Sequence, residues 1–178
     1  KSIAEPYTYN TSTYLGMVLS ATREQAADMK KFIQAVQLPA GFADYQAYTF
    51  VLPDDYLNVG PMVEIKGDEL FGPHVMIRAF PQGHARHAKF VQPWEGELVI
   101  TLGSVNTYFG DPAHRWDILL DEKASFGTVI ALTYYLCGQI QKVKPDYFMQ
   151  HIAAFCNDYG PKAYGKPEQF DIIVPANP

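Results

Sequence analysis

The sequence has little cysteine, no long apolar run and no concentration of basic residues, and each shortage excludes a class of protein. Two cysteines among 178 residues cannot form a disulfide framework. No apolar run approaches the roughly 18 to 20 residues that a membrane-spanning helix needs. The formal net charge is −5 and Lys and Arg are dispersed, so nucleic acid is not an expected partner. The shortages favour a soluble globular protein without a membrane span.

The compartment and the state of the two cysteines stay open. Cys137 and Cys156 each fall on the apolar side of an expected helix, and two buried free thiols are the favoured interpretation. The alternative is a disulfide between adjacent antiparallel helices, which would indicate export. The chain begins at Lys1 and lacks a signal-like apolar stretch. It is therefore either cytoplasmic or exported with its leader removed.

Length and composition predict a single globular domain over residues 1–178. Hydrophobic residues make up 48% of the chain and aromatic residues 14%, which is enough to build a core and argues against disorder. Within this domain we expect residues 1–11 to form a surface arm. Residues 160–178 are expected to form a tail rich in Gly and Pro.

Apolar periodicity predicts a chain of strands with a few helices. Thr22 and Gln25 have the spacing of a capping box, so a helix is expected to begin there and to end before Pro39. Two further helices are expected, from Ser125 to about Gln141 and from Pro145 to about Gly160. The expected strands cover residues 13–20, 45–52, 62–66, 74–80, 97–102 and 115–121, with a short edge strand at 170–174.

The order of these elements predicts an α+β fold. The connections between the expected strands look too short for helical crossovers, which favours consecutive antiparallel pairing. The expected architecture is a mainly antiparallel sheet, ferredoxin-like or a half-open barrel. One early helix and two packed C-terminal helices would cover its apolar face.

Alternation along the strands predicts one apolar face and one mixed face of the sheet. Arg78, Glu97 and Asp117 lie on the mixed face. A solvated surface is the favoured interpretation of such a face, and a small-molecule pocket with these residues as substrate-binding groups is the alternative. Arg78 is in mid-strand and needs an anionic partner. An ion pair with Glu97 or Asp117 is favoured over a substrate carboxylate.

Histidines concentrate in and after the expected strand at 74–80. His84 and His87 are three residues apart in a loop, and His74 and His114 could converge on them. Zinc and ferrous iron sites use two or three histidines together with a carboxylate. These four residues are therefore candidate ligands for a divalent metal, Zn or Fe. The favoured alternative is that they are surface histidines in a polar loop.

Two hypotheses of function follow. In the first, the chain is a small metal-dependent enzyme whose histidine cluster acts on a small anionic or aromatic substrate, with Arg78 orienting the anion. In the second, it is a non-catalytic binding protein whose ligand or protein partner contacts a tyrosine-rich surface. The second rests on tyrosines expected in loops and termini, namely Tyr7, Tyr9, Tyr108, Tyr159 and Tyr164.

Overall fold

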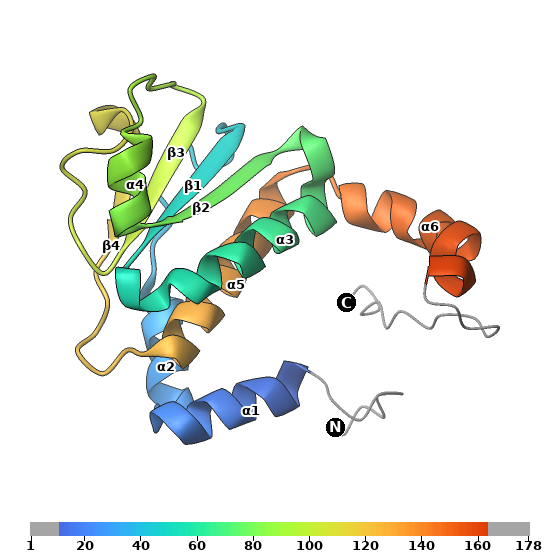
Figure 1. Ribbon diagram of the computed structural model, residues 1–178, viewed down its shortest axis with the longest axis horizontal. Helices are drawn as coiled ribbons and strands as arrows, with labels where there is room; N and C mark the ends of the chain where they lie inside the picture. Colours follow the sequence, from blue (N-terminus) through green and yellow to red (C-terminus); the bar gives the residue numbers. More distant parts are fainter. Residues whose placement is uncertain (1–10, 164–178) are drawn as a thin grey trace.

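The computed structural model describes residues 11–163 of the chain and the side chains of residues 14–155. Helices and strands alternate through most of this range (Figure 1). Short 3-10 helices, η1 (Asp54–Val59), η2 (Gly72–His74) and η3 (Pro112–His114), precede α3, β2 and β4. The helices and strands are α1 (Thr11–Thr22), α2 (Ala26–Ala35), β1 (Ala47–Leu52), α3 (Gly60–Phe71), β2 (Met76–Pro81), α4 (Gln82–Ala88), β3 (Glu97–Leu102), β4 (Arg115–Ile118), α5 (Phe126–Val143) and α6 (Tyr147–Ala163).

The described strands form one four-stranded sheet in the order β2-β1-β3-β4, and every neighbouring pair is parallel. The fold is therefore α/β, and the predicted antiparallel α+β sheet, ferredoxin-like or half-open barrel, is wrong. Parallel neighbours require a crossover of about a dozen residues or more. The crossover from β1 to β2 contains α3, and the crossover from β3 to β4 is a loop over residues 103–114.

Helix α3 occupies the segment in which a strand was predicted at residues 62–66. The alternation from Met62 to Lys66 is real, but a longer period overrides it: Val63, Gly67 and Phe71 recur every four residues and are all buried. Gly67 lets the helix approach β2 closely, because a Cβ there would lie 2.4 Å from the Cβ of Ile77. Gly67 is therefore a position at which α3 packs closely on β2.

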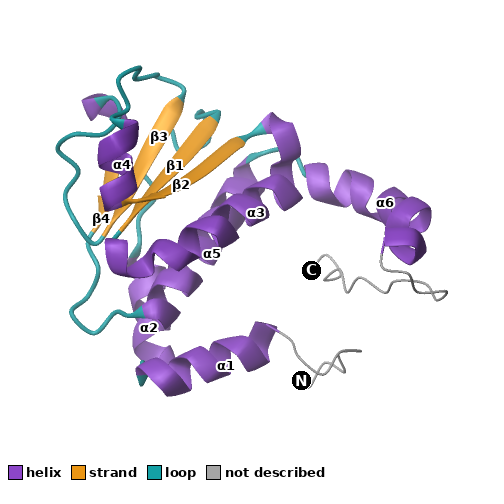
Figure 2. Cartoon of the chain, viewed as in Figure 1, coloured by secondary structure: helices purple, strands orange, loops and turns teal. Residues whose placement is uncertain are grey.

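The core fills the space between the sheet and the layer of α3 and α5 (Figure 2). Alternate residues of the two central strands point into it and are almost completely buried. The Tyr48 hydroxyl also lies in the core and donates a hydrogen bond of 2.6 Å to the carbonyl oxygen of Phe42. The strand residues of this core are Tyr48, Phe50 and Leu52 from β1 and Leu98, Ile100 and Leu102 from β3.

The opposite face of the sheet is covered by α4 and by the crossover loop 103–114. A smaller apolar cluster forms there, in which Ala85 of α4 and Phe109 of the loop pack on Val51 and Val99. Gly110 allows this close approach, since a Cβ there would lie 2.5 Å from Cγ2 of Val99. The predicted division into an apolar face and a mixed face is therefore present, although the mixed face is covered in part.

The first two helices pack against α5. Helix α1 replaces the strand predicted at residues 13–20. The predicted capping box is also wrong, since Thr22 ends α1 and the Gln25 side chain makes no cap hydrogen bond to α2. A helix at residues 26–35 lies within the predicted span. No residue of α2 is fully buried, so its attachment depends on other contacts.

The carboxylate of Glu24, between α1 and α2, supplies one such contact by capping α5. It accepts hydrogen bonds from the backbone N–H groups of Ser125 (2.8 Å), Gly127 (2.7 Å) and Thr128 (2.9 Å). The hydroxyls of Thr128 and Thr22 donate to it as well, at 2.6 and 2.7 Å. Burial alone would raise the pKa of Glu24, but these hydrogen bonds outweigh it and lower the pKa from 4.5 to about 2.

The two C-terminal helices lie close to their predicted positions. Helix α5 crosses the core, whereas α6 contacts α3 and projects away from the sheet (Figure 1). Cys137 is a buried free thiol whose pKa burial raises to about 12; the side chain of Cys156 lies outside the described residues. No helix in residues 11–163 has the length and apolar character needed to cross a membrane. The expected arm at 1–11, tail and strand at 170–174 fall largely or wholly outside this range.

Candidate ligand-binding site

Three polar side chains on the α4 side of the sheet form a connected group. The guanidinium of Arg78 on β2 pairs with the carboxylate of Glu97 on β3. The hydroxyl of Thr49, on the strand between them, donates a 2.5 Å hydrogen bond to Glu97 and accepts one of 3.2 Å from Nε of Arg78. The ion pair between Arg78 and Glu97, which the position of Arg78 in the middle of a strand predicted, is therefore present. The Glu97 side chain is 7% exposed and that of Arg78 38%, so the guanidinium still reaches solvent.

Asp117 lies on the same face but does not join this group. It pairs in register with Thr101, one strand away from the Arg78–Glu97 pair. Its Oδ1 and the hydroxyl of Thr101 are buried and have no hydrogen-bond partner in the described part of the chain. Of the three predicted substrate-binding residues, the structure therefore joins Arg78 and Glu97 and leaves Asp117 apart.

Aromatic rings continue from Arg78 across this face. The guanidinium carbon lies 5.8 Å from the ring centre of Phe80 and 5.5 Å from that of Phe90. Successive ring centres are 5.7 Å apart from Phe80 to Phe90, 5.6 Å from Phe90 to Phe109 and 6.3 Å from Phe109 to Tyr108. Tyr108, the last ring, is 77% exposed. The row therefore leads from the polar group of the sheet to the surface.

Hydrogen bonds hold the crossover loop that carries Tyr108 and Phe109. The side-chain oxygen of Asn106 accepts from the N–H groups of Tyr108 (3.1 Å) and Phe109 (2.8 Å), and its amide donates to the Phe109 carbonyl (2.9 Å). Arg115 donates to the carbonyls of Phe109 and Gly110, each at 2.7 Å. The backbone of the loop segment that carries these two rings is thus fixed by hydrogen bonds.

Arg86 of α4 and Lys89, which directly follows α4, line an open cavity of about 510 Å³ together with Tyr108 and Phe109. Arg86 and Lys89 are exposed, and neither forms an ion pair with any residue that the structure describes. The surrounding segment reinforces the positive charge, because residues 70–94 contain no Asp or Glu in a chain of net charge −5. An anion with a planar apolar part matches this lining.

The backbone is strained where α4 ends beside the cavity. Lys89 has φ 58° and Phe90 φ 50°, in the left-handed region that residues other than glycine rarely adopt. Such conformations cost on the order of 1 to 3 kcal/mol each and persist only where surrounding structure enforces them. They turn the chain so that the Phe90 ring joins the aromatic row while Lys89 lines the cavity.

The predicted histidine cluster does not form. Since a strand rises about 3.3 Å per residue, the length of β2 separates His74 from His84 by roughly 20 Å. His114 lies at the start of β4, at the other edge of the sheet from β2. No three His, Cys, Asp or Glu side chains in the described range come together in a way that could hold a metal ion. The predicted metal-binding group is wrong.

The four histidines have separate surroundings instead. The His74 ring stacks on Tyr147, with centres 4.2 Å apart and planes 11° apart. His114 shares a 3.0 Å hydrogen bond between Nδ1 and the Tyr45 hydroxyl. His84 and His87 are exposed on α4. The expectation of surface histidines fits His74, His84 and His87, which are all exposed, although they lie in helical segments rather than in a loop.

Sequence reasoning missed Arg86, Lys89 and Phe109 as site residues. The sequence did contain an indication of Arg86 and Lys89. Residues 70–94 contain no Asp or Glu, although the chain as a whole has a net charge of −5. Phe109 gave no signal of its own, because its place depends on how the crossover loop folds over the sheet. In comparisons with known proteins, no family model matches this chain and no curated protein matches it significantly.

Proposed function

We propose that the protein binds a small aromatic anion between α4 and the crossover loop 103–114, without catalysing its conversion. The single observation that carries this proposal is one cavity lined both by Arg86 and Lys89, which form no ion pair with any described residue, and by Tyr108 and Phe109. A carboxylate or phosphate would take two hydrogen bonds from the planar guanidinium of Arg86. Lys89 would add a second positive charge, and the ring of the ligand would stack on Tyr108.

Arg78 has a supporting role in this proposal. Its charge is largely neutralised by Glu97, so it is not the main anion-binding group. It lies against the rings of Phe80 and Phe90 and helps to hold them in the aromatic row. The proposal keeps the anionic and aromatic ligand chemistry expected from the sequence and moves its recognition from the histidines to α4. Tyr108 is the described member of the predicted tyrosine surface.

Isothermal titration with matched small molecules tests the proposal. Phenyl phosphate, which has both ring and charge, should bind more tightly than inorganic phosphate, and benzylammonium should not displace bound phenyl phosphate. Arg86→Gln should weaken phenyl phosphate about fivefold, the equivalent of ~1 kcal/mol for an exposed charged contact. Tyr108→Ala should weaken it by a factor of roughly three to ten, as expected for lost stacking.

Lys30→Gln is the matched control, because Lys30 is an exposed lysine on α2 and its loss changes the net charge by the same amount as the loss of Arg86. It should leave the affinity for phenyl phosphate unchanged. Equal losses in Arg86→Gln and Lys30→Gln would show that only the overall charge matters. That result, or displacement of phenyl phosphate by benzylammonium, would contradict the proposed site.

A further inference from the structure

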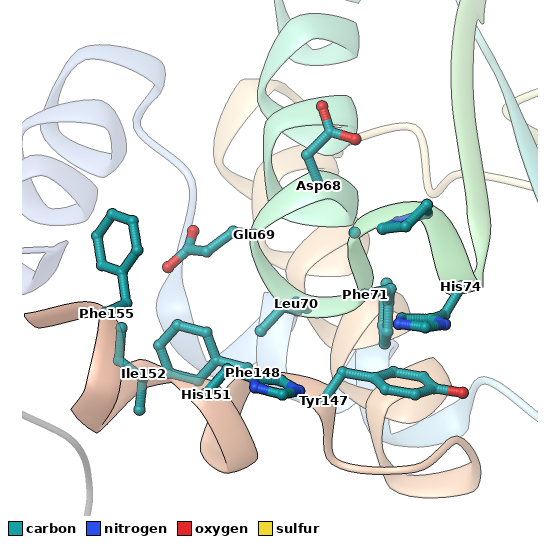
Figure 3. Close-up of a pocket in the computed structure, with 12 residues that line it drawn as sticks. Asp68, Glu69, Leu70, Phe71, His74, Tyr147, Phe148, His151, Ile152 and Phe155 are labelled. Atoms are coloured by element: carbon teal, nitrogen blue, oxygen red, sulfur yellow. The ribbon is translucent and has the colours of Figure 1, made fainter. Parts of the chain in front are cut away.

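A second cavity, of about 410 Å³, lies on the other side of the molecule, where the end of α3 and η2 meet the first turns of α6 (Figure 3). Leu70 reaches toward α6 from α3, and Phe148 and Ile152 of α6 contribute apolar surface (Figure 3). The volume falls in the range of small-molecule sites, about 300 to 1,000 Å³. The α4 site and this groove share no lining residue.

One end of the groove is an aromatic wall. His74 and Tyr147 are stacked there almost parallel, with the Phe71 ring beside them (Figure 3). Phe148 adds another ring from the next position of α6. The faces of aromatic rings carry partial negative charge and attract cations, most strongly those that water solvates poorly, such as substituted ammonium groups.

The formal charge of the groove is also negative. Its lining contains Asp68 and Glu69 but neither Lys nor Arg. Glu69 extends on the side of α3 that faces α6, whereas Asp68 points away from α6 (Figure 3). Lys66 pairs with Oε2 of Glu69, and Oε1 has no partner among the described residues. A cation in the groove would therefore meet the available oxygen of Glu69 and the ring of Phe148.

We propose that the groove between α3, η2 and α6 binds a small organic cation, an ammonium group carrying an aromatic or aliphatic body. The charged nitrogen would lie beside Glu69 and the Phe148 ring, and the body would extend along Leu70 and Ile152 toward the aromatic wall. The charge of this ligand is opposite to that of the ligand proposed for the α4 site. The two proposals therefore stand or fall separately.

Saturation-transfer NMR and calorimetry with three probes of similar size test this inference. Phenyltrimethylammonium should bind saturably, and its affinity should fall with added salt because exposed charges are screened. Benzoate, with the same ring and the opposite charge, should not compete with phenyltrimethylammonium, although the α4 site is expected to bind it. Benzyl alcohol should bind at least threefold more weakly than the cation. Equal binding of benzyl alcohol, or no saturable binding of the cation, would overturn the proposal.

Single substitutions test whether phenyltrimethylammonium binds in this groove. Glu69→Gln should weaken phenyltrimethylammonium about threefold, consistent with one exposed charge contact, and Phe148→Leu should weaken it by removing a ring while keeping apolar volume. Glu122→Gln is the matched control, since it removes the same charge from an exposed glutamate that does not line the groove. Tyr108→Ala, at the α4 site, should also have no effect. Equal losses in Glu69→Gln and Glu122→Gln would contradict the specific role of Glu69 and overturn the proposed geometry.

Discussion

The two faces of the sheet differ in what they bury. Toward α3 and α5 the strands present only apolar or aromatic side chains, and these join a continuous core with the helices. Toward α4 the same strands present a small apolar cluster and, beside it, four polar or charged side chains, Thr49, Arg78, Glu97 and Asp117. The first face accounts for the fold, because burial of apolar surface is the dominant stabilising term. The second face carries the features that packing alone does not explain.

Two of those features are unfavourable for stability taken alone. Thr101 and Asp117 have buried polar atoms without partners in the described part of the chain. Lys89 and Phe90 adopt left-handed backbone conformations, as Arg23 does between α1 and α2. Departures from local rules concentrate at functional sites in folded proteins. The comparison therefore supports placing the proposed binding site on the α4 face.

The sharpest test of the comparison uses adjacent residues of β3 that point to opposite faces. Ile100→Ala, on the α5 side, should destabilise the fold by about 3 to 4 kcal/mol because it leaves a cavity in the core. Thr101→Val, on the α4 side, should be neutral or stabilising by about 1 kcal/mol, since it removes a buried hydroxyl without a partner. Urea denaturation of both variants measures the difference. Similar destabilisation by both would contradict the distinction between the faces.

An intermediate effect is expected at Glu24, which ties the first two helices to α5. Glu24→Gln should cost about 1 to 2 kcal/mol, since it removes a charge that accepts hydrogen bonds at a helix N-terminus. Because folding lowers the pKa of Glu24 from 4.5 to about 2, its contribution is complete above pH 4.5 and is lost as the pH falls toward 2.

Urea denaturation between pH 7 and pH 2 tests this pH dependence. The wild-type protein should lose its advantage over Glu24→Gln between pH 4.5 and pH 2, and the two stability curves should converge. Glu122→Gln, at an exposed carboxylate with no hydrogen bond or ion pair in the described part of the chain, is the control and should run parallel to the wild type. Parallel curves for Glu24→Gln would contradict the capping role.

The sequence predicted local features better than their assembly. Alternation correctly assigned the faces of residues such as Ile77, Arg78 and Trp116, because side-chain direction in a strand depends only on position. The helices at 126–143 and 147–163 were predicted within a few residues, because their apolar stripes are long. Residues 13–20 were mistaken for a strand, since a short apolar run does not distinguish strand from helix.

The topology was missed for a related reason. Once residues 62–66 are taken as a strand, no segment remains between β1 and β2 to form a crossover, and antiparallel pairing follows. The positions of Val63, Gly67 and Phe71 reveal the helix only when the packing of Gly67 on Ile77 is known. The residues of the candidate site were likewise predicted only in part. Arg78 and Glu97 followed from alternation, whereas Lys89 and Tyr108 meet only because the loop 103–114 folds across the sheet.

The substitution with the smallest expected effect on stability tests the central claim most directly. The claim is that the left-handed backbone at the end of α4 costs stability and serves ligand binding. Lys89→Gly removes the side chain that lines the cavity and places at φ 58° the residue that tolerates it best. We expect the free energy of unfolding to rise by about 0.5 to 1 kcal/mol while the affinity for phenyl phosphate falls about fivefold. Denaturant titration and calorimetry on one preparation measure both. A variant that is less stable than the wild type, or that binds phenyl phosphate equally well, would contradict the account.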